Sequence, residues 1–206
     1  YLMGVSEDLP ISIAMEEYTI NDNLERVMGG IFRHSPNIIG LSCYIWNIEE
    51  TLHLVQALKK VMPESIIILG GPEVSYGTRK LMEDNPFVDI VLRGEGEVTF
   101  PLLLEGLALN KSLDNLKGIS FRCGDNIIEN EDRELIKDLD TLPFPYKNGF
   151  QGLENKIIYY ETSRGCPFSC QYCLSSIDQG VRFLSLDRVR EDIKIFIKAK
   201  ISQVKL

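Results

Sequence analysis

The sequence is short of several features that mark particular classes of protein. No apolar run among its 206 residues approaches the roughly 20 residues that a membrane-spanning helix needs. The N-terminal segment, Tyr-Leu-Met-Gly-Val-Ser-Glu-Asp, lacks the basic, apolar and cleavage regions of a secretory signal. Internal repeats and low-complexity tracts are missing as well. We therefore expect a cytoplasmic protein without a membrane segment.

The chain also has fewer positively charged than negatively charged side chains. The chain carries 22 Lys and Arg against 30 Asp and Glu, which gives a formal net charge of −8. A fold with this balance repels polyanions, so nucleic acid is not an expected partner. The composition, 44% hydrophobic and 25% charged, is ordinary for a globular protein of one or two domains.

The two ends of the sequence suggest a piece of a longer protein. The chain begins at Tyr1 rather than at Met, and it stops at Leu206 in what reads as the opening of a strand just after a helix. We expect further segments beyond these ends.

Residues 37–107 alternate short buried strands with helical patterns. The strand runs are rich in β-branched residues, and Gly or Pro follows most of them. Repeated β-α units of this kind predict a doubly wound parallel α/β sheet with helices on both faces. The predicted strands are residues 11–19, 38–42, 66–69 and 88–92, and the predicted helices are residues 23–32, 48–62, 75–83 and 99–109.

The pattern changes after Lys111. Residues 118–129 read as a β-hairpin, and Leu-Pro-Phe-Pro at 142–145 is a stiff extended connector. A strand over 156–161 and an amphipathic helix over 185–200 follow. We therefore predict an α/β domain over 1–112, a hairpin and linker over 113–150, and a further βα segment over 151–206.

Cysteine usage separates one motif from two isolated residues. A cytosolic protein with five cysteines is not expected to have a disulfide framework, and three of the five fall within eight residues. Cys166, Cys170 and Cys173 have the spacing C-x3-C-x2-C, which wraps one corner of a [4Fe-4S] cluster and leaves its fourth iron open. A zinc knuckle is the alternative, but Cys123, the nearest further cysteine, lies 43 residues before Cys166. Cys43 and Cys123 read as small apolar residues.

The ends of the predicted parallel strands form a second candidate site. Ligands of open α/β sheets bind beyond the carboxyl ends of the strands, and glycines there allow close approach to the backbone. The alternative is that these glycines only make tight turns. The candidates are Ser42, Gly70, Gly71, Gly94, Glu95 and Gly96.

The cysteine motif resembles the signature of the radical S-adenosylmethionine (SAM) superfamily. It follows a Ser-Arg-Gly segment, and the aromatic Tyr172 stands just before the last cysteine. The resemblance implies a [4Fe-4S] cluster on Cys166, Cys170 and Cys173 whose open iron binds SAM, with Tyr172 beside the adenine. It also implies one-electron cleavage of SAM to a 5′-deoxyadenosyl radical, with flavodoxin or ferredoxin as the reducing partner.

The strand ends, in order, resemble the cobalamin-binding-domain subfamily of these enzymes. A strand ending in a small hydroxyl residue is followed by Gly-Gly-Pro at 70–72, Gly-Glu-Gly-Glu at 94–97 and the Leu-Pro-Phe-Pro connector. The resemblance covers residues 10–206 and implies cobalamin against the six strand-end candidates, before the first part of a partial (β/α) barrel. It implies methyl transfer or oxidative cyclisation on an unactivated carbon of a small-molecule substrate, as in anaerobic magnesium-protoporphyrin ester cyclases.

The sequence departs from many cobalamin proteins in its histidines. Asp-x-His-x-x-Gly supplies a lower ligand to cobalt in those proteins, and neither His34 nor His53 stands in that pattern. Either the cobalt has no lower protein ligand, or the domain binds no corrinoid. Two alternatives of other classes also stay open beside the radical enzyme: a corrinoid-binding module without chemistry of its own, and a zinc-stabilised interaction protein. No residue is predicted to be catalytic by itself.

Overall fold

The computed structural model describes residues 1–147, 149–151, 153, 156–177 and 180–206. These residues form two compact units, which we call the sheet unit (Asp8–Leu135) and the cysteine unit (Tyr1–Glu7 with Ile136–Leu206). The division differs from the predicted boundaries at 112 and 150, which remain predictions.

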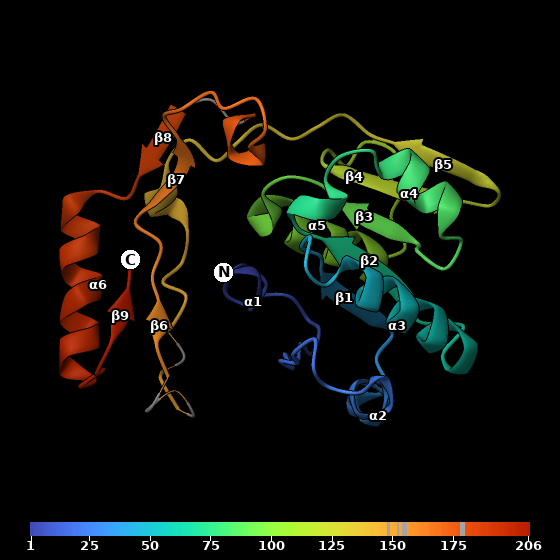
Figure 1. The fold of residues 1–206 in the computed structure, drawn as a ribbon, viewed down its shortest axis with the longest axis horizontal. Coiled ribbons are helices and arrows are strands. Elements are labelled where there is room, and N and C mark those ends of the chain that lie inside the picture. Colours follow the sequence, from blue (N-terminus) through green and yellow to red (C-terminus); the bar gives the residue numbers. More distant parts are fainter. Residues whose placement is uncertain (148, 152, 154–155, 178–179) are drawn as a thin grey trace. The chain divides into compact units, whose positions relative to one another are not determined.

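The sheet unit is built on strands that lie side by side in the order β1-β2-β3-β4-β5 (Figure 1). β1 pairs with β2 and β2 with β3 in parallel, while β4 and β5 form an antiparallel hairpin that extends the sheet beyond β3. The predicted parallel strands and the predicted hairpin are therefore confirmed. The strands are β1 (Ile38–Ser42), β2 (Ile66–Gly70), β3 (Ile90–Leu92), β4 (Ile119–Cys123) and β5 (Asn126–Glu129).

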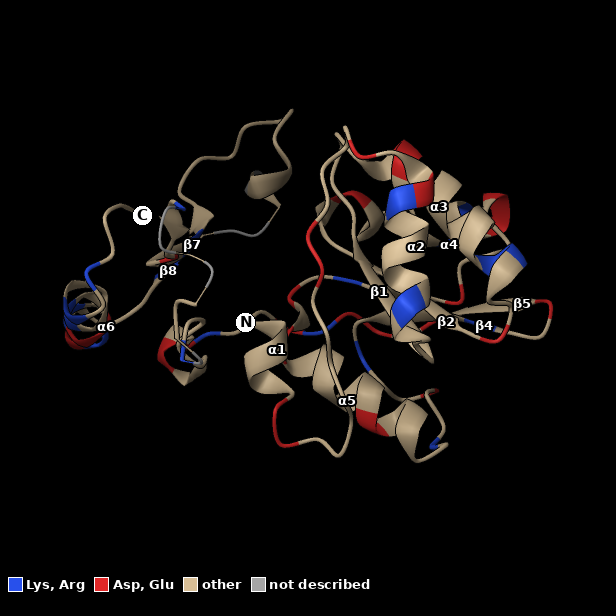
Figure 2. Cartoon of the chain, turned by 90° about the horizontal axis from the view of Figure 1, so that it is seen from below, with Lys and Arg blue, Asp and Glu red and all other residues tan. Residues whose placement is uncertain are grey.

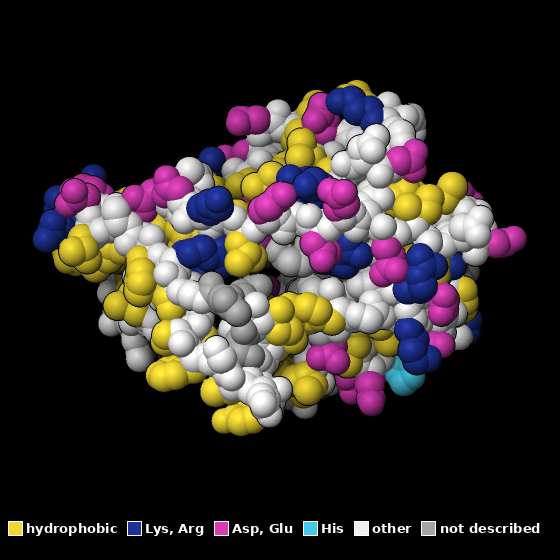
Figure 3. Space-filling view, turned by 90° about the horizontal axis from the view of Figure 1, so that it is seen from above, with side chains coloured by type: hydrophobic (Ala, Val, Ile, Leu, Met, Phe, Trp, Pro, Cys, Tyr) yellow, Lys and Arg dark blue, Asp and Glu magenta, His cyan; other side chains and the backbone are white. Residues whose placement is uncertain are grey.

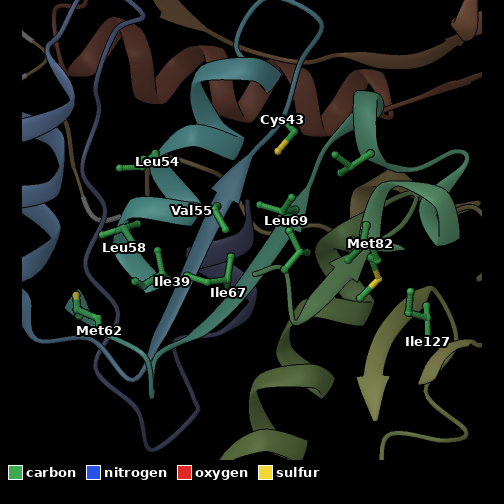
Figure 4. Packing of buried hydrophobic residues seen from close by; sticks show 13 residues of the cluster. Ile39, Cys43, Leu54, Val55, Leu58, Met62, Ile67, Leu69, Met82 and Ile127 are labelled. Atoms are coloured by element: carbon green, nitrogen blue, oxygen red, sulfur yellow. The ribbon is translucent and has the colours of Figure 1, made fainter. Parts of the chain in front are cut away.

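Helices cover both faces of this sheet, as a doubly wound fold requires. Figure 2 shows α2, α3 and α4 on one side of the strands and α5 on the other. Side chains along a strand point to alternate faces, so Ile67 and Leu69 of β2 enter the core on the α3 side (Figure 4), whereas Ile68 packs on the α5 side. The helices are α2 (Leu24–His34), α3 (Ile48–Val61), α4 (Thr78–Asp84) and α5 (Gly96–Ala108), with a 3-10 turn, η1, at Pro72–Val74.

The predicted strand over residues 11–19 is wrong, because this segment lies along α2 instead of pairing with β1. The hydroxyl of Tyr18 reaches the backbone of α2 at Gly30, where an added Cβ would meet it at 1.7 Å. The Nε2 atom of His34 lies 3.0 Å from Oε1 of Glu16. An extended segment held by side chains shows the same alternation as a strand. The predicted helix over 75–83 likewise begins later, at Thr78.

The cysteine unit contains a small parallel pair, β6 (Ile158–Tyr159) and β9 (Val204–Lys205), with α6 (Leu186–Lys198) between them in sequence. Its core includes Tyr160 and Phe196. The Tyr160 hydroxyl donates a hydrogen bond of 2.7 Å to Oδ2 of the buried Asp192, and burial raises the pKa of this hydroxyl. The remaining elements are α1 (Leu2–Val5), η2 (Leu139–Thr141), β7 (Ser163–Cys166), η3 (Leu174–Ser176) and β8 (Gly180–Phe183).

Charges of both signs are mixed on the surface. On the face seen in Figure 3, Lys and Arg lie among Asp and Glu, and the described residues there form no continuous basic area. Among the residues that the structure describes, every helix is too short or too polar to cross a membrane.

Candidate functional site

The carboxyl ends of the parallel strands meet at one edge of the sheet unit, which we call the carboxyl edge. Ser42, the last residue of β1, stands opposite Gly70, the last residue of β2, and Gly70 stands opposite Leu92 of β3. Gly94 and Glu95 follow β3 after Arg93, and Glu95 is the N-cap of α5. The structure therefore brings all six strand-end candidates to this edge.

Gly71 is required by the contact between two loops of the edge. Its φ of 111° lies in the left-handed region, and an added Cβ would lie 2.5 Å from the carbonyl oxygen of Cys43. The Cys43 amide also donates to the Gly70 carbonyl oxygen at 2.7 Å. At this position the glycine is explained by close approach of backbone to backbone.

Ser75 joins the loops after β2 and β3. Its hydroxyl donates to the carbonyl oxygen of Gly71 at 2.9 Å and accepts from the amide of Gly94 at 3.2 Å. Gly94 has a φ of 70°, and an added Cβ there would meet nothing within 4 Å. Ser75 is not among the residues predicted from the sequence, because a hydroxyl that bonds to backbone across loops leaves no sequence pattern.

Small side chains leave one part of the sheet open beside this edge. Three small residues of β1 and β2 lie on the same face of the sheet as Ile38, which packs in the core formed with α5. They are Gly40, Ser42 and Gly70, which we call the small-residue strip. Gly40 and Ser42 are exposed, and a Cβ on Gly40 would meet nothing within 4 Å. The strip therefore offers an uncovered stretch of backbone. Gly40 was missed in the sequence, where it read as a strand residue.

A pair of stacked aromatic rings lies on the loop after β1. The rings of Tyr44 and Trp46 are 4.6 Å apart between centroids and only 6° from parallel. Trp46, the chain's single tryptophan, is 63% exposed, and Ile45 between them is 76% exposed. An exposed aromatic ring face next to a glycine-rich edge is suited to a planar ligand.

The thiol and imidazole side chains near this unit do not point to a metal ligand at the edge. Cys43 is fully buried in the core (Figure 4), and burial raises the pKa of its thiol to about 12. His34 lies at the end of α2, before β1 begins, and bonds Glu16. His53 is exposed on α3, in a groove with Glu49 and Asp84. Both histidines therefore belong to helices and neither stands on a loop that follows a strand.

The three motif cysteines lie on one loop of the cysteine unit. Cys166 ends β7 opposite Gly180 of β8, and the amide of Cys173 donates to the carbonyl oxygen of Cys170 at 3.1 Å. All three are partly exposed, and Tyr172 between them is 93% exposed. In the described part of the chain, no three His, Cys, Asp or Glu side chains are arranged to hold a metal ion. The donor chemistry fits an iron–sulfur cluster, although the three cysteines do not form such a group in this structure.

The β7–β8 hairpin explains the glycine before the first motif cysteine. Gly165 has a φ of 99°, and an added Cβ would lie 2.2 Å from the carbonyl oxygen of Gly180. Only glycine allows the two strands to pair this closely. The hairpin therefore fixes where the cysteine loop starts.

Comparison with known proteins decides the family. The B12 binding domain family matches residues 1–104, which include the whole carboxyl edge. The chain belongs to this family. Among relatives, the cobalamin-dependent radical SAM methyltransferase TokK of Streptomyces tokunonensis is 31% identical over 170 residues, 78% of this chain. The anaerobic magnesium-protoporphyrin IX monomethyl ester cyclase of Synechocystis is 34% identical over 125 residues, 56% of this chain.

A solved structure shows the same fold over nearly the whole chain. The radical S-adenosylmethionine methyltransferase TsrM of Kitasatospora setae, with cobalamin and a [4Fe-4S] cluster bound, matches 98% of this chain with a TM-score of 0.75 at 13% identity. The chain spans 24% of the length of each of the two relatives above and 43% of the TsrM chain. It is a cobalamin-binding domain related to radical SAM methyltransferases and cyclases. The small-residue strip and the stacked rings fit that cofactor.

Proposed function

We propose that this chain binds cobalamin at the carboxyl edge and belongs to a cytoplasmic radical SAM enzyme that transfers a methyl group to an unactivated carbon of a small molecule. The observation that carries the proposal is the coincidence of an open strip, a flat aromatic pair and the B12 family match on one edge. Each of these features alone would suit other ligands.

Different residues of the carboxyl edge would bind the corrin ring and the nucleotide tail of the cofactor. The exposed rings of Tyr44 and Trp46 would carry the corrin by apolar contact. The small-residue strip would take the nucleotide tail against bare backbone, and Gly71 would keep the loops after β1 and β2 together beside it. Gly94, Glu95 and Gly96 lead into α5, whose first amides are suited to the phosphate and amide oxygens of the tail.

The cysteine loop would hold the second cofactor. Cys166, Cys170 and Cys173 supply three thiolates to a [4Fe-4S] cluster, and the exposed Tyr172 would pack beside the adenine of SAM. When bound, the two groups would supply a transferable methyl on the corrinoid and one electron to cleave SAM, with the electron arriving from a flavodoxin- or ferredoxin-type reductant. The partial exposure of the three thiols supports access to the cluster.

Oxidative cyclisation is the second candidate reaction. The Synechocystis relative, at 34% identity, is a cyclase, whereas TokK, at 31%, is a methyltransferase. Methyl transfer is the first candidate because, over the same 78% of this chain, TokK is 31% identical and a second cyclase only 26% identical.

Gly40→Val tests the cobalamin site without disturbing the fold. Gly40 has free space around its Cβ position, and valine favours strands, so the variant should be at least as stable as the wild type. The valine would fill the strip, and we expect hydroxocobalamin affinity to fall at least roughly tenfold, as a steric block of about 1.4 kcal/mol or more predicts. Equilibrium dialysis gives the affinity and a urea titration the stability. Equal affinity of the wild type and the variant for hydroxocobalamin would mean that the strip is not part of the cobalamin site.

A further inference from the structure

Asn47 links the aromatic loop to the end of β1 through both ends of its side-chain amide. Its Nδ2 donates to the carbonyl oxygen of Ser42 at 2.9 Å, and its Oδ1 accepts from the amide of Tyr44 at 2.7 Å. One side chain therefore fixes the backbone on both sides of Cys43.

The position of Asn47 in the fold makes this arrangement unusual. Asn47 is the N-cap of α3, and an N-cap asparagine ordinarily accepts a hydrogen bond from an amide of the helix's first turn. The Asn47 side chain makes no such bond, whereas Asn23, the N-cap of α2, accepts from the amide of Arg26 at 2.7 Å. Asn47 thus forgoes capping its helix and holds the preceding loop instead.

The loop that it holds is anchored at Cys43, whose backbone bonds Gly70 and Glu73, but it has little support beyond that residue. Ile45 and Trp46 are exposed, so core packing does not determine where the stacked rings lie. The backbone bonds of the segment return to Tyr44, whose carbonyl oxygen accepts from Asn47 at 3.0 Å and from Ile48 at 3.1 Å. These bonds close a turn but do not join it to β1, which is what the Nδ2–Ser42 bond does.

We propose that Asn47 is a positioning residue of the cobalamin site: it holds Tyr44 and Trp46 in the orientation that receives the corrin. This inference rests on the proposed function. A loop that already has its bound conformation loses little conformational entropy when the ligand binds. The hydrogen bond therefore contributes to affinity although Asn47 does not touch the cofactor.

Asn47→Asp separates positioning from helix capping. Aspartate caps helices as well as asparagine does but has no donor for the Ser42 carbonyl, so only the loop should suffer. Asn47→Ser removes the amide without adding charge and keeps a capping hydroxyl. Asn23→Asp is the matched control, because it makes the same change at an N-cap that bonds its own helix.

Two measurements on the full chain test the inference. Near-ultraviolet circular dichroism of the apoprotein reports the packing of Tyr44 on Trp46, and equilibrium dialysis gives the affinity for hydroxocobalamin. Both Asn47 variants should lose the stacking signal and bind about fivefold more weakly, as the loss of one hydrogen bond predicts. Asn23→Asp should match the wild type in both. If Asn47→Asp does not fold, Asn47→Ser decides.

Failure of the inference differs from failure of the proposed function. A wild type that binds cobalamin, with Asn47 variants within twofold of it or with an unchanged stacking signal, would overturn the positioning role alone. A wild type that does not bind cobalamin would overturn both.

Discussion

At the scale of single residues, Gly71 is fixed by the fold and not by a ligand. Alanine there would bring Cβ against the carbonyl oxygen of Cys43 and would hold a side chain at a φ of 111°. We expect Gly71→Ala to lower the free energy of unfolding by about 3 kcal/mol, the sum of modest strain and overpacking. A urea titration followed by the fluorescence of Trp46 measures it.

Gly29→Ala is the matched control for this prediction. Gly29 lies within α2, and its Cβ position has nothing within 4 Å, so alanine should raise the stability by up to about 1 kcal/mol. Equal effects of the two substitutions would contradict the account of Gly71.

The burial of the Cys43 thiol predicts a loss of stability at alkaline pH. Burial raises the pKa of its thiol from 9.0 to about 12, so the folded state keeps a proton that the unfolded state loses first. The free energy of unfolding should therefore fall between pH 9 and about 12, by at most about 1.4 kcal/mol per pH unit from this group.

Comparison with Cys43→Val isolates this thiol from lysines and tyrosines that titrate in the same range. The stability of the variant relative to the wild type should rise steadily above pH 9. A constant difference from pH 7 to pH 11 would mean that the thiol is not protected in the folded state.

The residues that end the strands could be predicted from the sequence, whereas the side chains that hold the following loops could not. Ser42 and Gly70 could be predicted because strand ends follow from hydrophobic pattern and glycine. Ser75 and Asn47 could not, because each acts by bonding backbone atoms whose positions depend on the folded sheet.

At the scale of elements, the cysteine loop carries the second cofactor prediction. The full chain, reconstituted anaerobically with iron and sulfide, should hold about four irons, and its reduced EPR signal should change on addition of SAM. The variant Cys166→Ala, Cys170→Ala, Cys173→Ala should lose the iron. Cys123→Ala, which removes an exposed cysteine at the β4–β5 turn, is the control and should keep it.

Zinc in place of iron, or iron retained by the triple variant, would contradict the cluster assignment. Zinc would favour the zinc-stabilised interaction protein instead. Cobalamin binding without iron would favour the corrinoid-binding module without chemistry of its own.

Some helices and strands could be predicted from hydrophobic periodicity alone. β1, β2 and α3 were predicted nearly to the residue, since each combines a regular apolar pattern with a Gly, Pro or polar boundary. The false strand at 11–19 shows the limit, because alternation alone does not reveal whether a partner strand exists. The late start of α4 follows from η1 and from Gly77, whose φ is 62°.

At the scale of the whole molecule, the two units have separate cores and carry separate candidate sites. The carboxyl edge lies in the sheet unit and the cysteine loop in the cysteine unit. The family could be predicted from the order of short motifs along the chain, although each motif is weak alone. The hairpin's place in the sheet could not, because pairing of β4 with β3 depends on contacts between residues distant in sequence.

The most direct test of the central claim, that cobalamin lies on the carboxyl edge, is quenching of Trp46 by hydroxocobalamin. Trp46 is the only tryptophan and lies on the proposed corrin surface, so all tryptophan emission comes from that surface. Free N-acetyltryptophanamide corrects for absorption by the corrin. We predict saturable, near-complete quenching that follows the dialysis isotherm. Binding without quenching would put cobalamin elsewhere on the chain, and absence of both would contradict the account.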